Sequence, residues 1–178
     1  MNRISVVGTS GSGKTAFAEK LSKILGVPHV ELDSLSWEAG WTPAPRDVFR
    51  SRVRKAIDAD RWVIDGNYSK DAGDLICERA DTYVWLNYSL PVILHRIVRR
   101  TLRRIVTREE CCNGNRESLR IALSRDSIIL WALRTYRRRR AEYPARLAAL
   151  EGRGARIVRL HSPKEADRWL AQLTLGKL

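Results

Sequence analysis

The chain has few of the features that mark secreted, zinc-binding or membrane-spanning proteins. It has three cysteines, Cys77 and the adjacent Cys111 and Cys112, an odd number without the CxxC or Cys/His spacing of a zinc site. The three histidines are also far apart in the sequence. No apolar run reaches the roughly 18 residues of a membrane-spanning helix. We therefore expect no disulfide framework, no zinc site and no membrane partner.

Long leaders, linkers and repeats are also absent from the sequence. The first residues lead at once into the apolar segment Ile4-Ser5-Val6-Val7, which leaves no room for a secretory signal peptide, so a cytoplasmic protein is expected. No internal repeat or low-complexity linker is visible. The 178 residues fit one compact domain spanning 1–178.

Acidic residues are scarce relative to basic ones. There are 33 Lys and Arg against 20 Asp and Glu, which gives a net charge of +13 and a pI near 10.4. Such a balance favours polyanionic partners such as nucleoside triphosphates, phosphorylated substrates or nucleic acid. The arginines are concentrated in one region, at positions 96, 99, 100, 103, 104, 108, 116, 120, 125, 134 and 137–140.

The most informative segment of the sequence is the octapeptide from Gly8 to Thr15, which has the pattern GxxxxGK[ST] of a phosphate-binding P-loop. Glycines and small residues let successive backbone N–H groups turn toward an anion. The Lys14 ammonium is expected to reach the β- and γ-phosphates of ATP, and the Thr15 hydroxyl to bind Mg²⁺. The residues expected to hold the nucleotide here are Gly8, Ser10, Gly11, Ser12, Gly13, Lys14 and Thr15.

Apolar segments and turn residues predict five strands that alternate with helices. The strands are expected at 4–7, 30–32, 62–66, 82–86 and 155–160. The helices are expected at 15–25, 47–58, 69–79, 91 to about 106, 117 to about 140 and 164 to about 173, with a short helix between Pro144 and Gly152. This alternation predicts a parallel α/β sandwich.

Two of these strands end next to an acidic residue. Asp65 ends its strand before Gly66, the place where P-loop enzymes hold Mg²⁺, although an Asp-Gly pair can also simply form a turn. Asp33 follows the second strand and is equally compatible with the active cleft, beyond the carboxyl ends of the strands, and with a helix cap or turn. Between these strands, Trp37 and Trp41 lie in a Pro/Gly-rich loop that either lines an acceptor pocket or covers the core.

The two arginine-rich helices are expected to form a basic hairpin. Arg96 and Arg100 are four residues apart and so share one helix face. The run Arg137-Arg138-Arg139-Arg140 is compatible with phosphate contacts and with a merely solvated face.

Taken together, these motifs resemble the P-loop kinases of the adenylate kinase and shikimate kinase group, along essentially the whole chain. Within that group, 62–68 and 113–118 are most similar to the small bacterial proteins called topology modulation protein or adenylate-kinase-related kinase. The resemblance implies a three-layer P-loop NTPase fold with strand order 2-3-1-4-5 and a helical lid-like insertion at 91–145. It also implies that Arg96 and Arg100 close over the phosphates, that Ser162 and Pro163 lie near the adenine, and that Asp33 contacts the acceptor.

One departure from the adenylate kinases bears on the acceptor. They place an arginine shortly after the Asp-Gly pair to hold a nucleoside monophosphate, whereas this chain continues Asn67-Tyr68-Ser69-Lys70. A lysine does not replace a bidentate arginine clamp, so the sequence argues against AMP as the acceptor.

The sequence therefore favours transfer of the γ-phosphate of Mg·ATP to a small acceptor, either a nucleotide or another small metabolite, with Lys14, Asp33, Arg96 and Arg100 as the catalytic residues. An alternative is a nucleotide-dependent regulatory protein that binds nucleic acid through the arginine-rich hairpin. A third reading is a P-loop domain that binds nucleotide without turnover. The sequence leaves the acceptor and the oligomeric state open.

Overall fold

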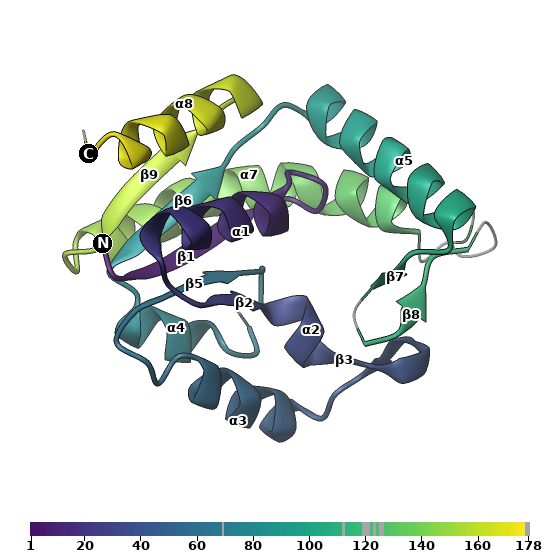
Figure 1. The fold of residues 1–178 in the computed structure, drawn as a ribbon, viewed down its shortest axis with the longest axis horizontal. Helices are drawn as coiled ribbons and strands as arrows, with labels where there is room; N and C mark the ends of the chain where they lie inside the picture. Colours follow the sequence, from purple (N-terminus) through teal and green to yellow (C-terminus); the bar gives the residue numbers. More distant parts are fainter. Residues whose placement is uncertain (69, 112, 119–121, 123, 125–126, 177–178) are drawn as a thin grey trace.

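The computed structural model describes residues 1–68, 70–111, 113–118, 122, 124 and 127–176. Its centre is a parallel sheet in the order β2-β5-β1-β6-β9 (Figure 1). The strands are β1 (Arg3–Gly8), β2 (His29–Glu31), β5 (Trp62–Asp65), β6 (Thr82–Leu86) and β9 (Arg156–Leu160). Numbered among themselves, these strands follow the order 2-3-1-4-5, which confirms the predicted topology.

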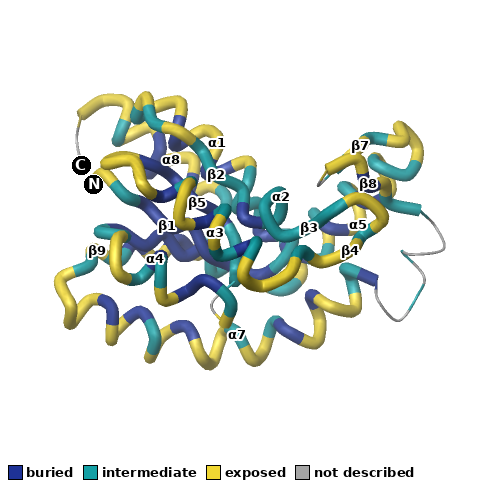
Figure 2. The backbone as a smooth tube through the Cα atoms, turned by 90° about the horizontal axis from the view of Figure 1, so that it is seen from below, coloured by how far each residue is buried: buried dark blue, intermediate teal, exposed yellow. Residues whose placement is uncertain are grey.

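Helices cover both faces of this sheet. One face packs against α1 (Lys14–Leu25), α5 (Leu90–Thr107) and α8 (Pro163–Thr174), and the other against α3 (Arg46–Ala56), α4 (Gly73–Arg79) and α7 (Ile128–Glu151). Successive strand residues point to opposite faces, so Val63 joins the first cluster whereas Trp62 and Ile64 join the second. Figure 2 shows the buried strands between these helices. The predicted three-layer α/β architecture is therefore confirmed.

Two short hairpins extend from the sheet on the side of its carboxyl edge. The first consists of α2 (Leu32–Ser36), β3 (Trp37–Glu38), the 3₁₀ turn η1 (Ala39–Trp41) and β4 (Thr42–Pro43). The second consists of β7 (Glu110–Cys111) and β8 (Asn115–Arg116), which follow α5. The tryptophan segment was expected to be a loop, but it pairs as β3 with β4, and the Trp37 and Trp41 rings meet edge to face at 5.8 Å.

The second arginine-rich helix differs from its predicted bounds. It was expected at 117–140, with Pro144 in a loop, but α7 runs through Pro144 to Glu151. A proline inside a helix costs about 3 kcal/mol because it removes a hydrogen bond. Burial of Tyr143, Leu147 and Leu150 against the sheet offsets that cost. Much of 117–127 lies outside the described residues.

Smaller differences concern element ends and cysteines. β2 ends at Glu31, so Asp33 lies in the first turn of α2 rather than at the strand end. α4 begins at Gly73, and Ser69, where this helix was expected to start, lies outside the described residues. Cys77 takes part in no disulfide among the described residues, and Cys112 is not described.

Within the described residues, no helix combines the length and the apolar composition needed to cross a bilayer.

The continuous α7 makes a prediction about stability. Leu147 is 1% exposed against the sheet, whereas Leu133 on the same helix is 40% exposed. We expect Leu147→Ala to lower the free energy of unfolding by about 2–5 kcal/mol, because it leaves a cavity, and Leu133→Ala to cost well under half as much. Denaturant unfolding measures both values. Equal losses would contradict the packing of α7 beyond Pro144.

Candidate active site

The P-loop joins β1 to α1 and turns through left-handed backbone at Gly11 (φ 83°) and Gly13 (φ 88°). Glycine is the residue that adopts this backbone without strain. A Cβ on Gly13 would lie 2.8 Å from Nη1 of Arg96, and one on Gly11 would collide with the side chain of Ile97. The loop therefore packs directly against α5, as a backbone cradle that larger residues would fill.

Lys14 begins α1 and is half-buried. Its ammonium group has only a long contact, 3.5 Å, to the carbonyl oxygen of Thr9. Burial lowers the pKa of Lys14, the carboxylates of Asp65 and Asp33 oppose that shift, and the cations of Arg139 and Arg100 add to it. Such a partly desolvated ammonium group, without a close partner of its own, suits a phosphate ligand.

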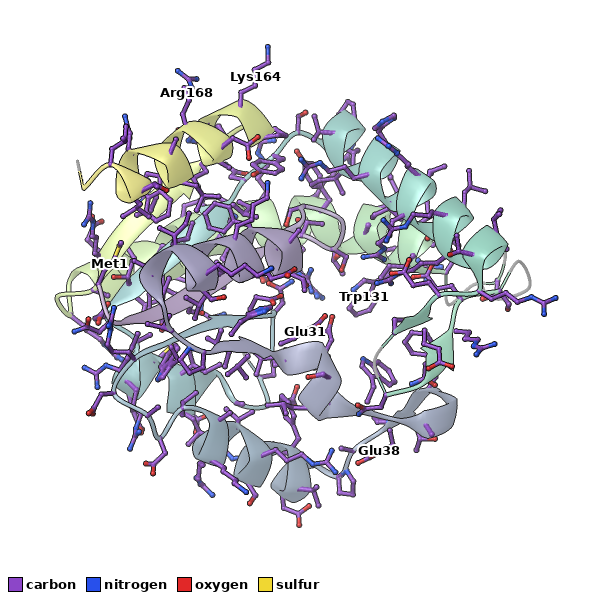
Figure 3. The ribbon with its side chains drawn as sticks, viewed as in Figure 1. Met1, Glu31, Glu38, Trp131, Lys164 and Arg168 are labelled. Atoms are coloured by element: carbon purple, nitrogen blue, oxygen red, sulfur yellow. The ribbon has the colours of Figure 1, made fainter. Side chains whose placement is uncertain are left out.

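Oxygen atoms gather beside Thr15 at the carboxyl ends of β2 and β5. The Thr15 hydroxyl lies within hydrogen-bond distance of two carboxylate oxygens, Oδ1 of Asp65 at 3.2 Å and Oε1 of Glu31 at 3.4 Å. Nε2 of His29 lies 2.8 Å from Oδ2 of the same Asp65, whose side chain is 3% exposed. Burial, followed by the charges of Asp65 and Asp33, raises the pKa of Glu31. In Figure 3, Glu31 lies between α1 and α2.

The hydroxyl and carboxylate oxygens gathered here suit Mg²⁺, which also binds water and phosphate. They suit less well a metal ion whose ligands are all protein side chains. In the described part of the chain, no group of three or more His, Cys, Asp and Glu residues is arranged to hold a metal. Mg²⁺ takes hard oxygen ligands and keeps waters and substrate phosphates in its coordination sphere, so a hydroxyl group and one or two carboxylates are sufficient. Thr15 and Asp65 supply these, with Glu31 adjacent.

Asp33 has a partner that the sequence analysis missed. The hydroxyl of Tyr68, from the loop after β5, donates to Oδ1 of Asp33 at 2.7 Å. Burial and the Asp33 charge raise the pKa of Tyr68, so this hydroxyl stays protonated. The Tyr68 ring packs 5.0 Å from that of Phe49, which fixes the loop. The contact between Tyr68 and Phe49 of α3 could not be predicted, because no local sequence pattern indicates it.

Asn67 was also missed, and it ties the start of the P-loop to the loop after β5. Its side-chain amide donates to the carbonyl oxygen of Gly8 at 2.6 Å and accepts from the Gly8 N–H at 3.3 Å. Its oxygen atom also accepts from the hydroxyl of Tyr143 on α7 at 2.7 Å. Asn67 thus holds together the P-loop, the loop after β5 and α7 at the carboxyl edge of the sheet.

Arginines approach the P-loop from α5. Arg96 donates from Nη1 to the carbonyl oxygen of Ser12 at 2.8 Å and stacks over Tyr88 at 5.3 Å. Further along α5, Oε1 of Glu117 lies 3.6 Å from Nη2 of Arg100 and 2.9 Å from Nη1 of Arg104. Burial lowers the pKa of Arg100, the neighbouring Arg104 cation adds to this shift, and Glu117 opposes it. The face shared by Arg96 and Arg100 is therefore the one that meets the P-loop.

Arg139 belongs to the run Arg137-Arg138-Arg139-Arg140, for which the sequence left open whether it contacts phosphate or only forms a solvated helix face. Arg137, Arg138 and Arg140 are exposed, whereas Arg139 is half-buried and its Nη1 has no hydrogen-bond partner among the described residues. Burial lowers the pKa of Arg139, and the Asp33 carboxylate opposes the shift. Its helical spacing with the buried Thr135 and Tyr143 was the signal that could have identified it.

Ser162 and Pro163 begin α8 after β9, on the same edge of the sheet as the P-loop. The Ser162 hydroxyl accepts from the N–H of Glu165 at 3.2 Å and so caps the helix. Their place near an adenine ring stays a prediction.

Comparisons with known proteins identify the fold. No protein-family model and no curated protein matches the chain. Among solved structures, a shikimate kinase from Bacteroides thetaiotaomicron has a TM-score of 0.59 at 16% identity and covers 99% of both chains. A gluconokinase from Sinorhizobium meliloti 1021 has a TM-score of 0.54 at 21% identity, covering 98% of this chain and 94% of the other. A shikimate kinase from Acinetobacter baumannii in complex with shikimate has a TM-score of 0.56 at 15% identity, with 99% and 94% coverage. The chain has the fold of P-loop kinases.

Proposed function

We propose that this protein is a phosphotransferase that moves the γ-phosphate of ATP, with Mg²⁺, to a hydroxyl group of a small acceptor that itself carries negative charge. The observation that carries this proposal is the presence of a carboxylate held by a tyrosine (Asp33) and of a half-buried guanidinium whose Nη1 has no hydrogen-bond partner among the described residues (Arg139). The charges of both side chains act on the pKa of Lys14.

On the nucleotide side, the P-loop amides and Lys14 would bind the β- and γ-phosphates. Thr15 and Asp65 would hold Mg²⁺, which supplies charge neutralisation on the phosphate oxygens. Arg96 is already bonded to the P-loop carbonyl of Ser12, and Arg100 lies one helical turn further along α5. These positions support the prediction that both arginines act on the phosphates.

On the acceptor side, Asp33 would take the proton from the acceptor hydroxyl. The acceptor oxygen bonds to the γ-phosphorus while the bond from that phosphorus to the β–γ bridging oxygen breaks, and ADP leaves with the electron pair. Tyr68 stays protonated and donates to Oδ1 of Asp33, and the other oxygen, Oδ2, would face the acceptor hydroxyl. Arg139 would bind an anionic group of the acceptor.

The nucleic-acid alternative gains no support from the arrangement of the arginines. Arg96 donates to the P-loop at Ser12, and Arg100 and Arg104 pair with Glu117, so these three side chains are engaged within the protein. The similar solved structures are named shikimate kinase and gluconokinase, and one holds shikimate. These names guide the acceptors to test. Membership of the topology modulation subgroup stays a proposal based on resemblance.

The direct test is ADP formation from Mg·ATP with a panel of acceptors. Shikimate and gluconate carry hydroxyl groups and a carboxylate, methyl shikimate and sorbitol are their uncharged counterparts, and AMP tests the nucleotide class. We expect an anionic hydroxy compound to stimulate ADP formation, its uncharged counterpart to do so far less, and AMP to do nothing. Lys14→Ala should lower the stimulated rate by about 10³-fold or more. If no acceptor raises turnover above that of the Lys14→Ala control, the proposal fails.

Asp33 is tested by removing its charge. Asp33→Asn should lower kcat by about 10²–10⁴-fold, because it removes the base, while the affinity for nucleotide changes little. The matched control is Asp47→Asn, since Asp47 is an exposed residue in the first turn of α3. Steady-state kinetics with the best acceptor of the panel gives both values. Wild-type kcat in Asp33→Asn would exclude Asp33 as the base.

Arg139 is tested against its exposed neighbour. We expect Arg139→Met to raise the KM for the anionic acceptor by about 10- to 100-fold, because a charge-assisted hydrogen bond contributes about 1.5–3 kcal/mol. Arg138→Met should leave that KM unchanged, and both variants should keep the wild-type KM for ATP. Equal effects of the two substitutions on the acceptor KM would rule out a specific anion contact by Arg139.

A further inference from the structure

Two segments that lie far apart in the sequence meet beside the active site. The acceptor arm comprises residues 32–43, from α2 to β4, and carries Asp33. The lid arm comprises residues 90–111 and 113–116, from α5 to β8, and carries Arg96 and Arg100. Figure 1 shows the β7–β8 hairpin beside β3 and the turn that follows it. Because the acceptor arm carries the proposed base and the lid arm carries the arginines proposed to act on the phosphates, the first serves the acceptor and the second the nucleotide.

Two asparagine side chains of the lid arm hold the acceptor arm by its backbone. Nδ2 of Asn113 donates to the carbonyl oxygens of Ser34, at 2.9 Å, and Trp37. Nδ2 of Asn115 donates to the carbonyl oxygen of Glu38 at 2.9 Å, and its Oδ1 accepts from the N–H of Trp41 at 2.7 Å. Asn115 is 4% exposed, so these bonds are shielded from water.

Residues with an unusual backbone conformation lie in the two segments that form this contact. The non-glycine residues with positive φ in the described chain are Trp41 (57°), Arg108 (51°) and Asn113 (62°), and all three lie on the two arms or directly after α5. A tryptophan in this region costs free energy, which the surrounding bonds must offset. The backbone N–H of Trp41 donates to Oδ1 of Asn115, so this asparagine bonds directly to the strained residue.

The lid arm also connects with the phosphate site. Glu117, two residues after Asn115, accepts from Arg104 and lies 3.6 Å from Arg100, while Arg96 donates to the P-loop at Ser12. Three groups of polar contacts, at the P-loop, at Glu117 and at the two asparagines, are therefore joined through the covalent chain of α5 and β8 and connect the P-loop with the backbone of α2 and β3. Coupling between sites requires such a physical connection.

We propose that Asn113 and Asn115 are positioning residues that fasten the lid arm to the acceptor arm, so that nucleotide binding also orders the segment that carries Asp33. This inference rests on the proposed function, because it needs a nucleotide at the P-loop and an acceptor at Asp33. Linkage makes the effect reciprocal, so an acceptor that orders the acceptor arm tightens nucleotide binding by the same factor.

Hydrogen exchange followed by mass spectrometry tests this without a known acceptor. The probe is Mg²⁺ with a non-hydrolysable ATP analogue that has an imido bridge between the β- and γ-phosphates. In the wild type, the probe should slow exchange in residues 8–15 and, by at least about fivefold, in residues 34–43. In Asn113→Gly/Asn115→Ala, residues 8–15 should be protected as before and residues 34–43 should no longer respond to the probe.

The control variants separate positioning from structural damage. Asn113→Gly keeps the left-handed backbone and removes only the bonds to Ser34 and Trp37, so it should lose part of the response. Arg116→Ala removes the pair with Glu110 inside the same hairpin and should keep the full response. A purely structural role would change exchange equally with and without the probe.

Two results would overturn the inference, and they differ from each other. Undiminished probe-dependent protection of residues 34–43 in the double variant, with residues 8–15 also protected, excludes coupling through the asparagines and leaves the proposed function intact. A wild-type protein whose residues 8–15 do not respond to the probe lacks the nucleotide site itself, and both the proposed function and the inference then fail.

Discussion

The structure depends on how closely the P-loop backbone packs against α5. Gly11 leaves no room for a side chain, because Ile97 occupies the space that a Cβ would need, and a Cβ on Gly13 would displace the Arg96 guanidinium. The same contact that shapes the phosphate cradle therefore sets the position of α5 and its inward-facing arginines. The shape of the P-loop and the placement of the lid arm are consequences of one packing constraint, and a larger residue at Gly11 would disturb both.

The carboxyl edge of the sheet gathers the remaining parts of the site. Because β1 lies between β5 and β6, the P-loop emerges next to Asp65, and Asn67 then joins its first residue to α7. Tyr68, the next residue, donates to Asp33 in α2, which belongs to the first hairpin. The proposed metal ligands, base and anion-binding arginine thus come from separate segments that the sheet order brings together.

The parts of the site that are local in sequence could be predicted, and those that depend on tertiary packing could not. The P-loop from Gly8 to Thr15 and the strand-end Asp65 are local patterns, and alternation of strands and helices indicated a parallel sheet. Tyr68 could not be identified, because its partner is 35 residues away. Arg139 was hidden in a run of arginines, and Pro144 suggested a helix end because the burial that offsets its cost is not local.

The measurement that tests the account most directly is phosphorus NMR of the reaction of Mg·ATP with the acceptor that most stimulates ADP formation. We propose that Lys14, Asp33 and Arg139 act where the γ-phosphate meets an anionic hydroxy compound, and the charges of Asp33 and Arg139 both act on the pKa of Lys14. The account predicts a phosphomonoester resonance that grows in a one-to-one ratio with ADP. Orthophosphate in that ratio, with no phosphomonoester, would show that water is the acceptor and would contradict the assignment of a phosphotransferase.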